Sequence, residues 1–147
     1  MEPSYEALRL KNQLCFPLYL CSKEIVRRYG PMLDELNLTY TQYIVMMYFW
    51  EVERSNAKEL SRALLLDPST LTPILKKLEQ KGYLSRSRDP ADERNLVVTL
   101  TESGAALQDA ALGVPTRMGC CLGLTEDEAA ALGAIIHKIL TNIEKEL

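Results

Sequence analysis

Apolar side chains recur at helical spacing along most of the chain. Between about residues 14 and 36 they return every three or four positions, which predicts an amphipathic helix. Because proline fits the first turn of a helix but breaks its interior, Pro17 predicts that this helix either starts close to Cys15 or kinks there. A second, very apolar helix is predicted next, where Thr39 and Gln42 have the spacing of a capping box, and we expect it at the centre of the fold.

Two short helices are predicted in the middle of the chain. The first runs from Asn56 to about Leu64. The second opens with Asp67 as its N-cap and Pro68 at the first helical position, and it ends in a basic turn before Gly82. Its inner face is apolar. Its outer face carries polar and basic side chains, namely Ser69, Thr70, Thr72, Lys76, Lys77 and Gln80.

Beyond this helix the period of the pattern changes from helical to alternating. Residues 83–88 and 96–100 alternate between apolar and polar side chains on either side of a charged, turn-rich segment, which predicts a two-stranded hairpin with a long loop. A helix over about residues 101–112 follows. Glycine and proline at residues 113–115 predict an interruption, after which a terminal amphipathic helix starts at residue 125.

These elements predict a mainly α-helical fold with a small β-hairpin. Two short helices followed by a hairpin form a winged helix-turn-helix, which we expect over residues 37–100. Residues 1–36 and 101–147 supply the flanking helices. The apolar stripe of the last helix, residues 132–143, has no obvious partner within a small winged domain. We therefore expect these flanking segments to form a dimerisation region within the same compact chain.

The composition of the chain excludes several classes of protein. Of its 147 residues 47% are hydrophobic and 25% are charged, which is typical of a soluble globular domain and not of a disordered or fibrous chain. No apolar run reaches the ~18–20 residues that a membrane-spanning helix needs. The N-terminus also lacks the pattern of a signal peptide, so we expect a cytoplasmic protein with no membrane association.

Charge is distributed unevenly along the chain. Residues 1–53 carry five Lys and Arg against seven Asp and Glu, whereas residues 54–94 carry nine against six. Residues 95–147 carry three against seven, so the overall net charge of −3 hides a basic middle between acidic ends. A polyanionic partner would therefore meet the middle segment.

The basic middle segment has the side chains of a DNA-reading surface. The polar outer face of the second short helix suits the major groove, where hydroxyl groups can bond base edges while Lys76 and Lys77 neutralise phosphates. Arg86, Arg88 and Arg94 place charge along the hairpin, where an arginine can enter a narrow minor groove. We therefore expect double-stranded DNA as the partner.

The motifs of this segment resemble the MarR family of bacterial transcription regulators. The resemblance rests on residues 71–82, on the charged loop within 86–94, and on the Leu-Thr-Glu-Ser-Gly motif at 100–104. It implies a dimer whose first and last helices form the interface and whose winged domains bind a pseudo-palindromic operator. It also implies that Asp92 and Arg94 lie at the wing tip, with Arg94 as the minor-groove contact.

The four cysteines do not have the spacing of a zinc site. No Cys-x-x-Cys pair occurs among Cys15, Cys21, Cys120 and Cys121, and the only histidine, His137, is remote from them in sequence. We therefore expect no metal and no cofactor. Cys15 stands at a predicted helix start, where the positive end of the helix dipole favours the thiolate. An accessible thiolate is the form that peroxides oxidise.

The segment around Cys15 resembles one group within the MarR family. Asn-Gln-Leu-Cys-Phe at residues 12–16 is similar to the organic hydroperoxide sensors of the MarR family, the OhrR type. The resemblance implies that Cys15 is the peroxidatic residue and that tyrosines at Tyr19, Tyr29 and Tyr40, partly from the partner subunit, donate hydrogen bonds to its thiolate. A phenol donor stabilises the charged sulfur, so these positions have a chemical rationale.

The two late cysteines suggest how an oxidised Cys15 is resolved. In the two-cysteine sensors of this type a disulfide forms between subunits with a cysteine between the last two helices, and Cys120 matches that position. Cys121 is one alternative, because two adjacent cysteines depart from the family pattern. A small thiol is the other, since the one-cysteine sensors of this type form a mixed disulfide with one.

Two further functions compete with a redox-switched repressor. One is a thiol peroxidase, but an enzyme has no need of the basic winged segment, so we expect no enzymatic activity. The other is a MarR-type repressor that a small aromatic acid releases from DNA, with no redox role for the cysteines.

Overall fold

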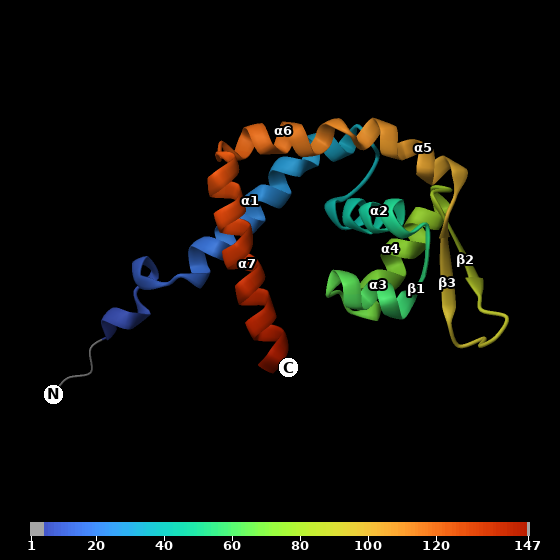
Figure 1. The fold of residues 1–147 in the computed structure, drawn as a ribbon, viewed down its shortest axis with the longest axis horizontal. Coiled ribbons are helices and arrows are strands. Elements are labelled where there is room, and N and C mark those ends of the chain that lie inside the picture. Colours follow the sequence, from blue (N-terminus) through green and yellow to red (C-terminus); the bar gives the residue numbers. More distant parts are fainter. Residues whose placement is uncertain (1–4, 147) are drawn as a thin grey trace. The chain divides into compact units, whose positions relative to one another are not determined.

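The computed structural model describes residues 5–146 (Figure 1). Two short 3-10 helices precede seven α-helices and three strands in this part of the chain. The 3-10 helices are η1 (Tyr5–Leu8) and η2 (Leu10–Asn12), and the remaining elements are α1 (Cys15–Asp34), α2 (Tyr40–Val52), β1 (Arg54–Asn56), α3 (Ala57–Leu64), α4 (Pro68–Gln80), β2 (Leu84–Arg88), β3 (Leu96–Leu100), α5 (Glu102–Ala111), α6 (Gly113–Leu122) and α7 (Glu126–Glu146). No helix within residues 5–146 is long and apolar enough to cross a membrane.

Helix α1 begins at Cys15, which decides between the two alternatives for Pro17. The proline occupies the third position of the helix, where its missing N–H would have no partner inside the helix anyway. A second proline, Pro31, lies near the other end, and the helix continues past it to Asp34. The turn that follows contains Asn37 in a left-handed conformation, with φ at 53°.

Helix α2 starts with the predicted capping box. The Thr39 hydroxyl accepts a hydrogen bond from the Gln42 N–H at 3.3 Å, and the Gln42 side-chain oxygen accepts one from the Thr39 N–H at 3.1 Å. Val45, Met46 and Phe49 are completely buried, so α2 lies at the centre of the core as predicted.

The predicted hairpin exists, but the sheet has three strands instead of two. Strands β2 and β3 pair in antiparallel register, and β1 pairs with the other edge of β3, which gives the order β1-β3-β2. Ser55 of β1 lies opposite Val98, whose other neighbour is Arg86 of β2. Strand β1 has only three residues between two helices, too few to show an alternating pattern in the sequence.

Helices α3 and α4 follow most of the predicted capping. The Asn56 side chain accepts a hydrogen bond from the Glu59 N–H at 2.8 Å and caps α3. Asp67 occupies the N-cap position of α4 and Pro68 the first helical position, as predicted, although the Asp67 side chain makes no capping hydrogen bond. Helix α4 continues through Pro73 and ends before Gly82, whose φ of 80° suits glycine. Its buried inner face consists of Leu71, Ile74, Leu75 and Leu78, as predicted.

The described chain divides into two compact units, residues 1–112 and 113–147. In the first unit, α2, α3 and α4 pack against one another and α4 contacts β2, so the three helices lie beside the sheet (Figure 1). The Trp50 indole N–H donates a hydrogen bond to the Gly104 carbonyl at 2.9 Å, which ties α2 to the start of α5.

The second unit contains a helix that the sequence pattern did not predict. Glycine and proline at 113–115 interrupt the helical path as predicted, since α5 ends at Ala111 and α6 starts at Gly113. They form the first turn of α6, a position where proline is tolerated. Cys120 and Cys121 therefore lie on α6 itself and not in a connection between the last two helices. Helix α7 starts with a capping box next to the predicted residue, because Thr125 and Glu128 exchange hydrogen bonds at 2.9 and 3.2 Å.

We expect Gly104→Ala to destabilise the first unit. A Cβ atom at this position would overlap the backbone carbonyl of Tyr83 and would lie 2.8 Å from Leu100 Cδ1. The clash involves backbone and a core side chain, so the free energy of unfolding should fall by about 2–3 kcal/mol. Gly30→Ala is the control, because nothing lies within 4 Å of its added Cβ and a helical alanine should leave stability equal or higher. Equal urea midpoints for Gly104→Ala and the parent protein would contradict this close packing.

Candidate nucleic-acid interface and cysteine site

The outer face of α4 is open to solvent in the described structure. Ser69, Thr70 and Thr72 are exposed in its first half, and Lys76 and Lys77 are exposed in its second half. The Thr72 hydroxyl donates to the Pro68 carbonyl at 2.8 Å, so its oxygen keeps only acceptor capacity for a base or water. The structure thus places all five predicted residues on one solvent-facing helix whose other face is core.

Hydrogen bonds within the loop between β2 and β3 fix its conformation. The Asp92 side chain accepts a hydrogen bond from the Arg94 N–H at 3.1 Å. Aspartate often forms this kind of turn with the backbone two residues further on. Arg88 donates from Nη1 to the Glu93 carbonyl at 2.9 Å across the base of the tip. Asp92 and Arg88 therefore have structural roles in the loop, while Arg94 is exposed and lines a hollow with Lys58 of α3.

Arg86 differs from the other two wing arginines. Its guanidinium donates to the Glu79 carboxylate at 2.7 and 2.9 Å, and its backbone N–H donates to the same carboxyl group at 3.1 Å. The pair fixes the end of α4 against β2. Arg86 was predicted as a DNA contact, whereas in the structure its charge is already matched by Glu79. Glu79 was not among the predicted site residues.

The Glu79–Arg86 pair makes stability depend on acid pH. Hydrogen bonding to Arg86, together with its charge, lowers the pKa of Glu79 below the ordinary value of 4.5. The unfolded chain therefore binds this proton more readily than the folded one, so the pair stabilises the fold above pH ~4.5 and the stabilisation disappears as pH falls through the lowered pKa.

We expect the parent protein to be more stable than Glu79→Gln at neutral pH. The difference should shrink as the pH of chemical denaturation is lowered below ~4.5, because the carboxylate is then protonated. Glu51→Gln, an exposed substitution on α2, is the matched control and should show no such pH-dependent difference. A difference between the Glu79 variant and the parent that stays constant down to pH 3 would contradict the role of the charged pair.

Cys15 is the first residue of α1 and is exposed in the isolated chain. At this position the residue belongs to the first turn of the helix, whose backbone N–H groups have no partner within the helix. Exposed apolar side chains surround it in sequence, with Leu14, Phe16 and Leu18 all at least 38% exposed. Tyr19 follows one helical turn later and is 62% exposed.

The other two predicted tyrosines lie together, on two different helices. The ring centroids of Tyr29 on α1 and Tyr40 on α2 are 4.9 Å apart, and Tyr43 lies 5.9 Å from Tyr29. Burial, and then the neighbouring Tyr40, raise the pKa of Tyr29, and burial chiefly raises the pKa of Tyr43. Both phenols therefore keep their protons at neutral pH and remain hydrogen-bond donors. Tyr43 is 3% exposed and packs in the core.

The geometry of α1 separates Cys15 from this tyrosine cluster. Tyr29 lies fourteen positions after Cys15 on the same helix, which at a rise of ~1.5 Å per residue is about 21 Å along the axis. Of the three predicted tyrosines, only Tyr19 neighbours Cys15 within one chain. Tyr29 and Tyr40 could reach a Cys15 thiolate only in a second copy of the protein.

The remaining cysteines are also exposed in the isolated chain. Cys120 and Cys121 are consecutive on α6, where successive side chains point about 100° apart around the helix axis. The two thiols therefore face different directions. Cys21 on α1 is exposed as well, although burial is the common state of an unreactive cysteine.

Helix α7 carries an exposed apolar stripe. Its side chains are between 41% and 57% exposed at Leu132, Ile135, Ile136, Leu140 and Ile143. A contiguous apolar helix face of this kind usually marks an interaction surface.

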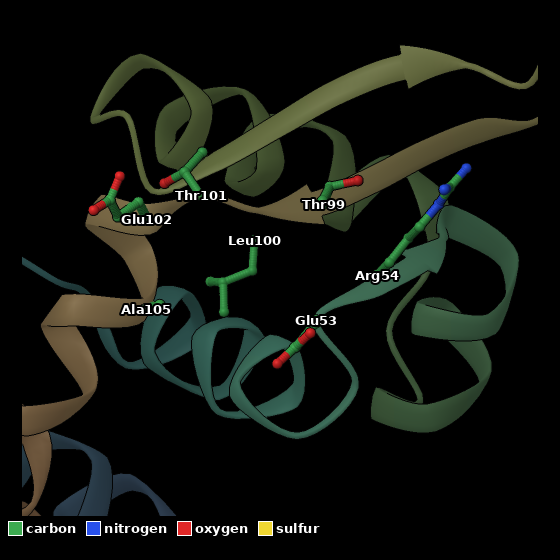
Figure 2. A pocket seen from close by; sticks show the side chains of 7 residues that line it. All are labelled: Glu53, Arg54, Thr99, Leu100, Thr101, Glu102 and Ala105. Atoms are coloured by element: carbon green, nitrogen blue, oxygen red, sulfur yellow. The ribbon is translucent and has the colours of Figure 1, made fainter.

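Two hollows lie on the first unit, and they differ in charge. The larger, of about 340 Å³, lies between the start of α5 and strands β1 and β3, and Figure 2 shows the Glu53 and Glu102 carboxylates on either side of Leu100. The Arg54 side chain extends away from Glu53 in the same view (Figure 2). The smaller, of about 240 Å³, is lined by Lys58 and Arg94 and has no acidic residue. No group of His, Cys, Asp or Glu among residues 5–146 could hold a metal ion.

Known proteins resemble this chain over nearly its whole length. The family model for the transcriptional regulators SarA and Rot matches residues 27–110. The organic hydroperoxide resistance transcriptional regulator of Bacillus subtilis strain 168 is 40% identical over 144 residues, which cover 98% of this chain and 96% of that protein.

Solved structures resemble the chain in fold as well as in sequence. The structure of reduced AbfR bound to DNA, a protein of Staphylococcus epidermidis, has a TM-score of 0.83 and 33% identity and covers 95% of this chain and 96% of its own. A disulfide form of AbfR matches with a TM-score of 0.65 and 35% identity over 95% of each chain. A MarR mutant of E. coli complexed with operator DNA matches with a TM-score of 0.81 and 26% identity, over 95% of this chain and 99% of that one. These relatives are winged-helix transcriptional regulators and not enzymes, and the chain described here belongs to the MarR-type family of transcription regulators.

Proposed function

We propose that the protein is a DNA-binding repressor that senses organic hydroperoxides through Cys15 and releases its operator on oxidation. The observation that carries this proposal is the placement of Cys15. It is an exposed thiol in the first turn of α1, about 21 Å along that helix from a paired set of tyrosines that only a second subunit could present to it. The hydroperoxide regulator of Bacillus subtilis, at 40% identity, supports the same signal.

The DNA-binding half of the proposal rests on α4 and the wing. Helix α4 presents its exposed hydroxyl and lysine side chains to the major groove of a double-stranded operator, and Arg94 at the wing tip enters the adjacent minor groove. Related structures of AbfR and MarR with DNA support this assignment. Arg86 acts through its pair with Glu79, which holds the wing against α4.

A homodimer has the two-fold symmetry that matches a pseudo-palindromic operator. The exposed apolar stripe of α7 and the exposed apolar residues of α1 form the interface between subunits. In that arrangement Tyr29 and Tyr40 of one subunit donate hydrogen bonds to the Cys15 thiolate of the other. This pairing stabilises the ionised sulfur and couples its state to the interface.

The chemical step is a two-electron oxidation of sulfur. The Cys15 thiolate attacks the terminal peroxide oxygen, the O–O bond breaks, and after one proton is taken up the products are the sulfenic acid of Cys15 and an alcohol. A second thiol, Cys120 or Cys121 of the other subunit, then attacks the sulfenic acid, forms a disulfide and releases water. The exposed apolar side chains at Leu14, Phe16 and Leu18 favour organic peroxides over hydrogen peroxide.

The test is release of the protein from its own upstream DNA. Reduced protein is bound to that DNA, cumene hydroperoxide or hydrogen peroxide is added, and binding is followed by fluorescence anisotropy. We expect release at lower concentrations of the organic peroxide, and restoration of binding when the disulfide is reduced. Retention of DNA by protein whose Cys15 is shown by mass spectrometry to be oxidised would contradict the proposal.

A ligand-released repressor is the second candidate, and the smaller hollow favours it. Lys58 and Arg94 line this space of about 240 Å³ without any carboxylate, so a small aromatic acid would find matching charge there. The larger hollow, with Glu53 and Glu102, would repel the same ligand. Release of DNA by an aromatic acid such as salicylate under reducing conditions, with no response to hydroperoxide, would establish this candidate instead.

A further inference from the structure

One lysine ties the end of α4 to the start of α2. Lys81 follows the last residue of α4, and its ammonium group donates to the Gln42 side-chain oxygen at 2.9 Å and to the Asn37 backbone carbonyl. These two acceptors lie at the beginning of α2 and in the turn before it. The contact therefore joins segments about forty residues apart in sequence.

Gln42 makes this contact part of the helix cap. Its side-chain oxygen accepts from the Thr39 N–H at 3.1 Å and from Lys81 Nζ at 2.9 Å, so one buried oxygen serves both the capping box and the lysine. Tyr40, the first residue of α2, lies inside that capping box. Its ring packs against Tyr29 at a centroid distance of 4.9 Å. A displacement of Tyr40 would thus act on the hydrogen bonds of Gln42.

On the other side, Lys81 is fixed to α4 and to the wing. Its backbone N–H donates to the Lys77 carbonyl at 3.0 Å, and the next residue, Gly82, accepts from the Thr101 hydroxyl at 2.6 Å. The Tyr83 N–H donates to the Leu78 carbonyl at 3.0 Å. Because the backbone around Lys81 is bonded in this way, a pull on its side chain would move the end of α4 and the start of β2 together.

The ammonium group of Lys81 depends on these acceptors. Burial, and then the nearby Lys77 charge, lower the pKa of Lys81, because the group is partly removed from water. An ammonium group that is partly removed from water gains from hydrogen-bond acceptors, and Gln42 and Asn37 supply two of them.

We propose that Lys81 is the positioning residue that transmits the state of the tyrosine cluster to the DNA-reading helix. Through Gln42 and Asn37 it holds the end of α4 in the orientation that binds DNA, and movement of Tyr40 is passed to α4 through this contact. The inference rests on the proposed function for the origin of that movement, which is oxidation of Cys15 of the partner subunit.

The first test compares operator affinity before and after oxidation. The dissociation constant is measured for reduced protein and for protein treated with cumene hydroperoxide, and the ratio of the two reports transmission. We expect a ratio of at least tenfold for the parent and at least a threefold smaller ratio for Lys81→Met, with Lys81→Arg retaining most of the parent ratio. Lys77→Met removes the same charge from the same helix, and it should weaken binding in both states while leaving the ratio unchanged.

The outcomes separate the inference from the proposed function. A parent ratio of one means that hydroperoxide sensing fails. A large parent ratio that Lys81→Met leaves unchanged overturns the role of Lys81. Thermal unfolding shows whether Lys81→Met is folded. If it is not, Lys81→Gln takes its place, because its shorter, uncharged side chain does not reach both acceptors, and a ratio equal to that of the parent overturns the inference in the same way.

A second test needs no oxidant. Tyr40→Ala is combined with Lys81→Met, and operator affinity of the reduced proteins is measured in a double-mutant cycle. We expect Tyr40→Ala to weaken binding at least threefold in the parent and much less in the Lys81→Met background, because the connection is already broken there. Additive effects of the two substitutions would show that Tyr40 does not act through Lys81, whatever the signal of the protein is.

Discussion

Cys15→Ser is expected to bind operator DNA with the affinity of the reduced parent and to keep it after treatment with organic hydroperoxide. The hydroxyl is nearly isosteric with the thiol but does not form a sulfenic acid, so the oxidation step is lost while the first turn of α1 is retained. At a hydroperoxide concentration that weakens parent binding at least tenfold, the variant should change by less than twofold. Anisotropy of a labelled operator measures both states.

The other cysteines provide matched controls for this result. Cys21→Ser removes a second exposed thiol from the same helix and should leave the response intact. Cys120→Ser should still be oxidised at Cys15 but should give no covalent dimer on a non-reducing gel. A covalent dimer that persists in Cys120→Ser and disappears in Cys121→Ser would assign the resolving role to the second thiol. Release of Cys15→Ser by hydroperoxide would favour the ligand-released alternative.

The ends of most helices could be predicted because their causes are local. The capping boxes that start α2 and α7 join residues three positions apart, and the glycine after α4 has the positive φ that its position needs. The periodic apolar face of α4 likewise predicted its buried side correctly. Such features depend on chemistry within one helical turn, which a single sequence displays.

Features that depend on distant partners were missed. Strand β1 exists because Ser55 and its neighbours pair with β3, more than forty residues later, and three residues carry no periodic signal of their own. The Glu79–Arg86 pair and the Lys81–Gln42 contact also join different elements. Charge counts placed Arg86 on the wing, but only the fold shows that its guanidinium faces a carboxylate.

The cysteine site likewise combines features with a local cause and features that depend on distant partners. A helix start close to Cys15 was one of the two alternatives that Pro17 left open, and the structure begins α1 at this residue. The assignment of Tyr29 and Tyr40 came from the family resemblance, and the structure brings those two rings together. In the proposed homodimer their contact with Cys15 forms between subunits, and such a contact leaves no local pattern in the sequence.

Arg94→Ala is expected to weaken operator binding at least tenfold at moderate salt. The side chain is exposed at the tip of the wing, and its backbone N–H is held by Asp92 at 3.1 Å, so the loop already has the shape that presents it. A good groove contact is worth ~1–3 kcal/mol, and ~1.4 kcal/mol corresponds to a factor of ten. Arg94→Lys keeps the charge but loses the planar guanidinium, and its affinity should lie between those of the parent and Arg94→Ala.

The control for this effect is an arginine that does not lie on the wing loop. Arg54→Ala removes the same charge from β1, at the opposite edge of the sheet from β2, and should weaken binding by less than threefold. If both alanine variants lost affinity equally, and raising the salt removed the loss in each, the wing would contribute only general positive charge. A selective loss at Arg94 that persists at higher salt would instead show that the tip of the wing occupies a groove, because only a close contact survives screening of the phosphates.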